Sequence, residues 1–181
     1  MHTFVALLRG INVGGKTMVS MPELRSHLAS MGLEDVSTYV QSGNVIFSTS
    51  NSDRQAVADA IEDRIGGAFD VSPSVLLRTP AELARIATAN PFLDRETDFL
   101  KLHVVFLSDT PAAAAAAKLD PERSPPDEFS VRGSEIYLHL PNGSARSKLT
   151  IDYFEKQLGG RATARNWKTL TKLVELTQAS R

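Results

Sequence analysis

The sequence predicts an α+β fold made of two tandem ferredoxin-like (βαββαβ) units with a C-terminal helix. Apolar runs and helical stripes follow the order β-α-β-β-α-β over residues 1–79, the first unit. The same order returns over residues 101–181, after a linking helix and turn at 80–100. Strands also come in pairs across short Gly-containing turns, which favours antiparallel hairpins over a parallel sheet. The two halves share this pattern but no obvious sequence.

The first helix has the best-marked boundaries of the predicted elements. A strand at residues 3–9 precedes it. Ser20 and Glu23 have the spacing of a capping box, which satisfies free backbone N–H groups of the first helical turn. Gly32 is typical of a helix end, because glycine adopts the left-handed conformation at little cost. We therefore expect a helix from Ser20 to about Met31.

A hairpin, a second helix and a fourth strand complete the first unit. Two runs rich in Val, Ile, Tyr and Phe, at 36–41 and 44–48, flank Ser42-Gly43, which predicts a tight turn between paired strands. A capping box from Ser52 to Gln55 begins the second helix, and residues 73–79 form the fourth strand.

The second half is predicted by the same signals. Thr79 to Glu82 cap a linking helix that runs to about Ala89. The elements after it are a strand at 101–107, an Ala-rich helix from Pro111, a hairpin of 128–132 and 135–140 across Gly133-Ser134, a helix at about 149–158, a short strand at 161–165 and a last helix at about 166–178.

Composition excludes several classes of function. The chain has no cysteine, so disulfides, thiolate metal sites and Cys nucleophiles are ruled out. Its four histidines lack metal-ligand spacing, and we expect no metal site. We expect a cytoplasmic protein with no membrane partner, because no apolar run approaches the roughly 20 residues of a membrane span. Residues 1–140 carry 12 Lys+Arg and 18 Asp+Glu, whereas 141–181 carry 8 and 3, so the C-terminal fifth is basic.

A Gly-rich segment after the first strand, Gly10 to Thr17, matches the phosphate-loop pattern G-x-x-x-x-G-K-[ST]. A P-loop needs a helix that begins at its lysine, whereas this helix begins at Ser20, and Pro22 would lie inside a helix begun earlier. P-loop enzymes also use a parallel sheet. The sequence therefore disfavours a Walker-type ATPase. Two interpretations stay open: a connecting turn, and a backbone nest that binds an anion.

Four polar segments follow strands that topology brings to shared sheet edges. The first two strands run parallel, so the Gly-rich segment and the hairpin turn should be neighbours. The third and fourth strands of the second unit likewise end at one edge. We expect the two edges to face each other across a cleft between the units, a common place for a ligand site. The candidate ligand-binding residues are Arg9, Asn12, Gly14, Gly15, Lys16, Gln41, Ser42, Gly43, Asn44, Ser147, Lys148, Arg165, Asn166 and Trp167.

Each of these groups also has a purely structural interpretation. Gln41 to Asn44 fits a plain hairpin turn, and Ser147 fits a helix cap. Trp167 lies on the apolar stripe of the last helix, where a core residue is expected.

The same motifs carry a resemblance. RGINVGGK, TYVQSGNVIF, the Asn90-Pro91-Phe92 turn, PNGSARSKLT and TARNWKTLTKL together resemble the bacterial family catalogued as domain of unknown function 1697. The resemblance covers nearly the whole chain and implies a small α+β, ferredoxin-like protein with no established activity. It implies recurrent polar positions at the candidate residues above except Lys16, and at Pro141 and Gly143. Typical members do not keep Ser or Thr after the lysine of the first loop, which makes Thr17 incidental and weakens the Walker reading.

Three functions are compatible with this sequence. The preferred one is a module that binds a phosphate-bearing or other anionic ligand, a nucleotide or nucleic acid, in the predicted cleft. The second is a small enzyme that uses the same cleft, with Lys148, Ser147 or Ser42 as reactive groups. The third is an interaction protein whose glycines serve only turns. The sequence does not identify a reaction, a cofactor or an oligomeric state.

Overall fold

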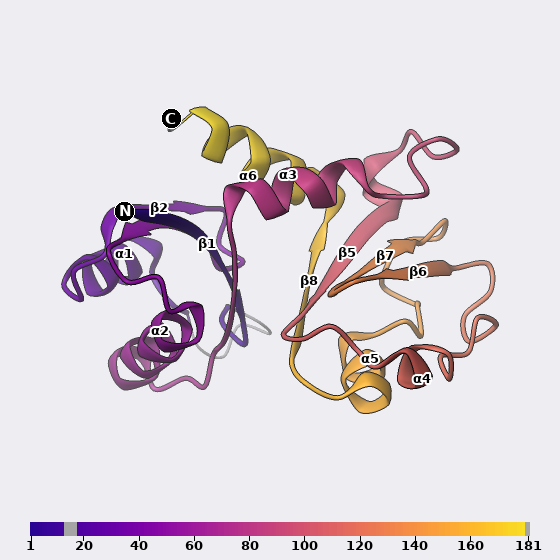
Figure 1. Cartoon of the computed structure of the whole chain (residues 1–181), viewed down its shortest axis with the longest axis horizontal. Coiled ribbons are helices and arrows are strands. Elements are labelled where there is room, and N and C mark those ends of the chain that lie inside the picture. The colour runs from indigo at the N-terminus through magenta and orange to yellow at the C-terminus, as the bar shows by residue number, and fades with distance from the viewer. Residues whose placement is uncertain (13–17, 180–181) are drawn as a thin grey trace. The chain divides into compact units, whose positions relative to one another are not determined.

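The computed structural model describes residues 1–12 and 18–179, so the predicted ligand residues Gly14, Gly15 and Lys16 lie outside the described residues. Within these residues the fold is mixed α+β, with two four-stranded antiparallel sheets and six α-helices (Figure 1). The chain divides into two compact units. The first unit is Met1–Leu83 with the residues from Thr177 on, and the second unit is Ala84–Leu176. None of the helices in the described part of the chain is long and apolar enough to span a bilayer.

The two sheets have the same strand order. The first contains β1 (His2–Arg9), β2 (Glu34–Tyr39), β3 (Asn44–Thr49) and β4 (Ser74–Arg78), in the order β2-β3-β1-β4. The second contains β5 (Leu102–Leu107), β6 (Glu128–Arg132), β7 (Glu135–His139) and β8 (Ala162–Asn166), in the order β6-β7-β5-β8. Counted within its own unit, each sheet therefore reads 2-3-1-4, and every neighbouring pair is antiparallel.

The helices follow the strands in the same sequence in both halves. They are α1 (Met21–Ala29), α2 (Arg54–Phe69), α3 (Pro80–Thr88), α4 (Ala113–Ala116), α5 (Ile151–Leu158) and α6 (Trp167–Ala179), with a short 3-10 helix, η1, at Phe99–Lys101.

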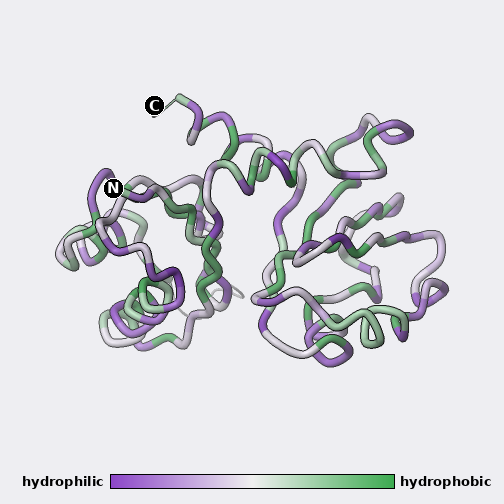
Figure 2. Tube along the Cα trace, in the orientation of Figure 1, coloured by the Kyte–Doolittle hydropathy of each residue, from purple (hydrophilic) through white to green (hydrophobic). Residues whose placement is uncertain are grey.

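In the first unit α1 and α2 cover one face of the sheet (Figure 1). Leu24, Leu28, Ile61 and Ile65 of the helices are fully buried against the strands. Alternate residues of β1, beginning at Phe4, face these helices, as the two-residue period of a strand requires. In Figure 2 the middle of β1 is coloured hydrophobic, between hydrophilic end residues.

In the second unit α4 and α5 lie beside one face of the sheet, where Phe154 of α5 is fully buried with Ile136. Tyr137, on the opposite side of β7, donates its hydroxyl to the carbonyl oxygen of Ile86 in α3 at 3.1 Å. Its ring centroid lies 6.2 Å from that of Trp167 in α6. Burial raises the pKa of Tyr137 to about 12. The second sheet is therefore packed on both faces.

Several predicted boundaries are confirmed by capping contacts. The Ser20 hydroxyl accepts a hydrogen bond from the Glu23 N–H at 3.5 Å, and α1 begins at the next residue. Thr79 and Glu82 form a complete capping box at α3: the Thr79 hydroxyl accepts from the Glu82 N–H at 3.2 Å, and the Glu82 carboxylate accepts from the Thr79 N–H at 2.7 Å. The hairpin across Gly133-Ser134 is also confirmed.

Three predicted boundaries were wrong. The turn between β2 and β3 has four residues, 40–43, because β2 already ends at Tyr39. The N-cap of α2 is Asp53, whose carboxylate accepts from the Ala56 N–H at 3.1 Å, and not Ser52. The Ala-rich helix is only four residues long, because it has no side-chain cap and no buried residue to anchor further turns.

Candidate functional site

The ends of β1 and β2 lie together at one edge of the first sheet, and the Asn12 side chain joins them. Its Nδ2 donates to the carbonyl oxygens of Gln41 at 2.8 Å and Val19 at 3.1 Å. Its Oδ1 accepts from the Val19 N–H at 2.7 Å. The expected contact between the Gly-rich segment and the hairpin turn is thus confirmed for the described residues. Asn12 has a φ of 52°, a left-handed conformation that Asn tolerates.

The hairpin turn requires a glycine at position 43. Gly43 has a φ of 81°, and its carbonyl oxygen accepts from the Leu8 N–H at 2.8 Å. An added Cβ would lie 2.8 Å from the Leu8 Cβ and 2.9 Å from Cδ1 of Ile11. Close approach of two chain segments, together with the positive φ, explains this glycine without a ligand.

Asn44 is fully buried behind the same turn. Its Nδ2 donates to the carbonyl oxygen of Tyr39 at 3.0 Å and to the hydroxyl of Ser42 at 3.2 Å. These two hydrogen bonds hold the turn between β2 and β3 in its conformation. Gln41 and Ser42 remain exposed on its outer surface, and Arg9 is partly exposed at the end of β1.

At one edge of the second sheet, β7 and β8 end side by side, because Leu102 pairs with His139 and His103 pairs with Asn166. This shared edge was predicted. The Asn166 Oδ1 accepts from the Thr169 N–H at 2.8 Å and so caps α6.

The other two predicted residues at this edge are buried. Trp167 is 1% exposed and is a core residue. Arg165 is 8% exposed, and burial lowers the pKa of its guanidinium to about 10. Its Nη1 donates to the Thr163 hydroxyl at 2.9 Å and to the carbonyl oxygen of Ala164 at 2.7 Å. Ligand roles for both stay predictions.

The loop after β7 lines a pocket of about 180 Å³ inside the second unit. One wall is the turn 124–127, and the other is formed by the residues of loop 141–147. The lining residues are Ser124, Pro125, Pro126, Asp127, Asn142, Gly143, Arg146 and Ser147. Of the residues predicted for ligand binding, Ser147 therefore lies in this wall, next to Lys148.

A hydrogen-bond network fixes the two walls to each other. The Ser124 hydroxyl donates to Oδ2 of Asp127 at 2.7 Å and accepts from the Lys148 N–H at 3.0 Å. The Ser147 hydroxyl accepts from the Leu149 N–H at 3.1 Å. It is not the cap of α5, which is Thr150. The pocket is thus a built feature of the fold.

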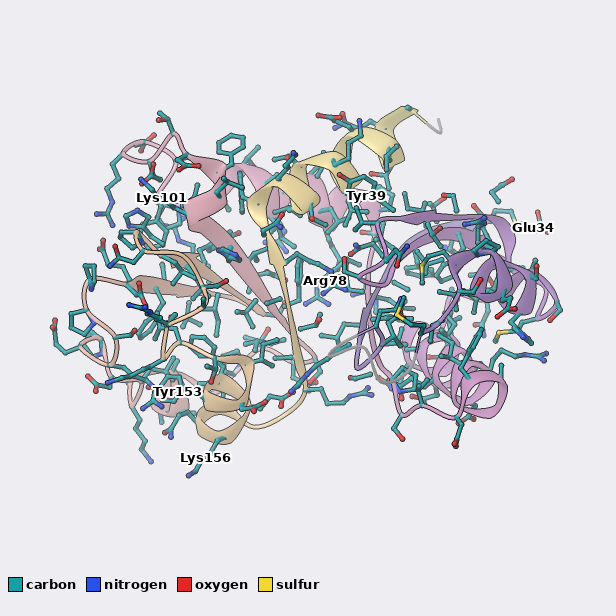
Figure 3. All side chains as sticks on the ribbon, turned by 180° about the vertical axis from the view of Figure 1, so that it is seen from behind. Glu34, Tyr39, Arg78, Lys101, Tyr153 and Lys156 are labelled. Atoms are coloured by element: carbon teal, nitrogen blue, oxygen red, sulfur yellow. The ribbon has the colours of Figure 1, made fainter. Side chains whose placement is uncertain are left out.

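Arg146 lines this pocket, and two further cations, Arg123 and Lys148, directly adjoin the lining residues Ser124 and Ser147 in the sequence. The Arg123 Nε donates to the Lys148 carbonyl oxygen at 2.9 Å, and its guanidinium lies 3.9 Å from the ring centroid of Tyr153. Tyr153 is labelled on α5 in Figure 3. Arg146 and Lys148 are exposed. None of the three has an ion-pair partner within residues 1–12 and 18–179.

Sequence reasoning missed Arg123, Ser124, Asp127 and Arg146 as site residues. Arg146 stands inside the PNGSARSK motif, so its charge was visible. The other three lie about 20 residues away in the sequence, and the pattern alone does not show that their turn meets this loop.

A second charged cluster lies in the same unit. His139, 9% exposed, has Nε2 3.0 Å from a Glu96 carboxylate oxygen and Nδ1 3.4 Å from one of Glu128. The Asp98 N–H holds the pKa of Glu96 below its ordinary value, and Arg95 does the same for Glu128. Every member has a partner, so the cluster is structural. Within the described residues, no group of His and acidic side chains could hold a metal ion.

Two larger hollows lie in the first unit. The more open one, about 680 Å³, runs between α1 and α2 past His27, Asp63 and Arg64. The other, about 320 Å³, lies at the chain start beside Thr79. None of the predicted ligand residues that the structure describes lines either hollow.

Comparison with known proteins now gives the family. A family model described as Protein of unknown function (DUF1697) matches residues 1–137. The chain belongs to this family. The DUF1697 match takes in the turn 124–127 but ends before the loop 141–147. No curated protein matches the chain.

A solved structure supports the DUF1697 fold over the full length. The chain is similar to a conserved bacterial protein from Streptococcus pneumoniae, with a TM-score of 0.70 and 23% identity, over 97% of this chain and 98% of the other. At that identity the similarity shows the fold alone.

Proposed function

We propose that this protein is a module that binds a phosphate-bearing or other anionic ligand in the cytoplasm. The observation that carries the proposal is the pocket in the second unit, which Arg146 lines and whose wall residues adjoin Arg123 and Lys148 in the sequence. None of these three cations has an ion-pair partner in the described residues. A guanidinium such as that of Arg146 matches the geometry of phosphate or carboxylate oxygens, and Lys148 adds a mobile point charge.

Pre-organisation of Arg123 also supports anion binding. Its Nε is bonded to the backbone and its face stacks on Tyr153, so the guanidinium loses little freedom when its remaining N–H groups bind a ligand. Nucleotides and nucleic acids carry the phosphate that such a group recognises.

The fold attribution belongs to the same proposal. Each unit has the element order β-α-β-β-α-β and the strand order 2-3-1-4, which together are the topology of a ferredoxin-like unit. We therefore interpret the chain as two tandem ferredoxin-like units. In the first of them, Arg9, Gln41 and Ser42 lie at a polar edge, and their part in ligand binding, like the predicted cleft, is a hypothesis.

Binding of inorganic phosphate tests the proposed function. A ligand bound only by the folded chain stabilises it by about 2.7 kcal/mol at one hundred times its Kd, so the melting temperature should rise with phosphate concentration. Arg146→Ala or Lys148→Ala should weaken binding and flatten its dependence on salt.

The matched control is Lys156→Ala, because Lys156 is an exposed lysine of the same unit, on α5 (Figure 3), and, unlike Lys148, adjoins no residue of the pocket wall in the sequence. A melting temperature that does not respond to phosphate, or an equal effect of Lys156→Ala and Lys148→Ala, would contradict the proposal.

A further inference from the structure

The pocket in the second unit contains one group that a simple anion does not need. Asp127 is 8% exposed, and its Oδ2 accepts the Ser124 hydroxyl at 2.7 Å. Its own N–H donates to the Ser124 carbonyl oxygen at 2.7 Å. Its second carboxylate oxygen, Oδ1, has no hydrogen-bond partner in the described part of the chain. This oxygen is also not completely enclosed by protein atoms. Oδ1 is therefore an acceptor available to a ligand in the pocket.

Formal charge limits what the ligand can be. Arg146 and Asp127 line the pocket, and Arg123 and Lys148 adjoin its wall residues in the sequence, so these four groups together carry a formal charge of +2. A phosphate monoester carries about −1.5 to −2 at pH 7 and so balances this charge. A zwitterion such as a free amino acid could satisfy Asp127, but it has no net charge and would not balance the +2.

Volume limits the ligand further. Ligand pockets for larger organic molecules measure about 300–1,000 Å³. This one has about 180 Å³, which corresponds to roughly six water molecules at about 30 Å³ each. A phosphate with a short hydroxylated carbon chain fits that space, whereas a whole nucleotide does not.

We propose that this pocket binds a small phosphorylated polyol or sugar, with the phosphate toward the cations and a ligand hydroxyl donating to Oδ1 of Asp127. The inference rests on the proposed function and specifies its substrate class. Asp127 would discriminate between phosphate esters, because a hydrogen bond to a charged group is lost when the ligand lacks the hydroxyl.

Two ligands of equal carbon number test the inference on the unmodified chain. Glycerol 3-phosphate and propyl phosphate share the phosphate and three carbons but differ in the hydroxyls. Isothermal titration calorimetry should give a Kd about tenfold lower for glycerol 3-phosphate. Equal affinities would overturn the inference but leave anion binding standing. Absence of binding by both esters and by inorganic phosphate would reject the proposed function as well.

Variants then locate the preference. Asp127→Asn can still accept the Ser124 hydroxyl, and it should remove most of the tenfold preference without weakening propyl phosphate. Asp109→Asn is the matched control, because the Ser108 hydroxyl donates to Asp109 at 2.8 Å and accepts from the Arg161 N–H at 3.0 Å, away from the pocket. A preference that persists in Asp127→Asn, or tighter binding of adenosine monophosphate or serine than of glycerol 3-phosphate, would overturn the inference.

Discussion

Replacement of Asn12 should destabilise the first unit more than its half-buried loop position suggests. Three hydrogen bonds depend on this side chain, two from Nδ2 and one to Oδ1. At about 1 kcal/mol each, Asn12→Gly should lower the free energy of unfolding by about 3 kcal/mol. Asn12→Ala should cost about 1 kcal/mol more, because Ala is strained at a φ of 52°. Such losses are a large share of the roughly 5–15 kcal/mol of a typical domain.

Urea unfolding followed by far-UV circular dichroism measures these differences. Amide hydrogen exchange at Val19 adds a local measurement, because its N–H donates to Asn12 at 2.7 Å and should exchange faster in both variants. Asn51→Ala is the control, since Asn51 Oδ1 accepts one local bond, from the Asp53 N–H at 2.9 Å. The reasoning fails if Asn12→Ala costs no more than Asn51→Ala and leaves Val19 exchange unchanged.

Three further predictions follow from single contacts. Gly43→Ala should lower the free energy of unfolding by at least about 2 kcal/mol, because the new Cβ would lie 2.8 Å from the Leu8 Cβ and the φ of 81° is strained for Ala. Wild-type stability of this variant in urea would contradict the prediction. Burial raises the pKa of Glu82, but hydrogen bonding to the Thr79 N–H and the charge of Arg54 lower it more, so the folded pKa lies below the ordinary 4.5. The ionised Glu82 therefore stabilises the fold fully above pH 4.5, and this stabilisation is lost as the pH falls through the folded pKa. Acid titration of Glu82→Gln should therefore show a shallower loss, and parallel curves would refute it. Burial lowers the pKa of His103 below 6.5, so the unfolded chain binds the proton first and stability falls as pH drops below 6.5. In His103→Leu this dependence should weaken between pH 7 and 5, and an unchanged profile would count against it.

Local signals in the sequence predicted the fold well where one residue decides a boundary. Ser20 and the Thr79–Glu82 box begin helices as expected, and Gly133-Ser134 joins a hairpin as expected. The pattern failed where two neighbouring residues compete. Ser52 and Asp53 both suit an N-cap, and the Asp carboxylate takes the position.

The candidate site was harder to predict, because it depends on contacts between distant segments. Parallel strand direction correctly placed Asn12 beside Gln41. The sequence pattern did not indicate that the Asn12 side chain is hydrogen-bonded to backbone groups. Nor did it indicate that Asp127 lines a pocket together with the loop after β7. The position of Asp127 follows from how the turn 124–127 folds back, which sequence periodicity does not record.

The packing of Trp167 has a practical consequence. It is the sole tryptophan of the chain, it is 1% exposed, and its ring neighbour Tyr137 belongs to the same unit. Intrinsic fluorescence excited at the indole therefore reports on the second unit alone, whereas circular dichroism sums both. Superimposable melting curves from the two signals would reveal one cooperative transition, and separated curves would reveal halves that melt on their own.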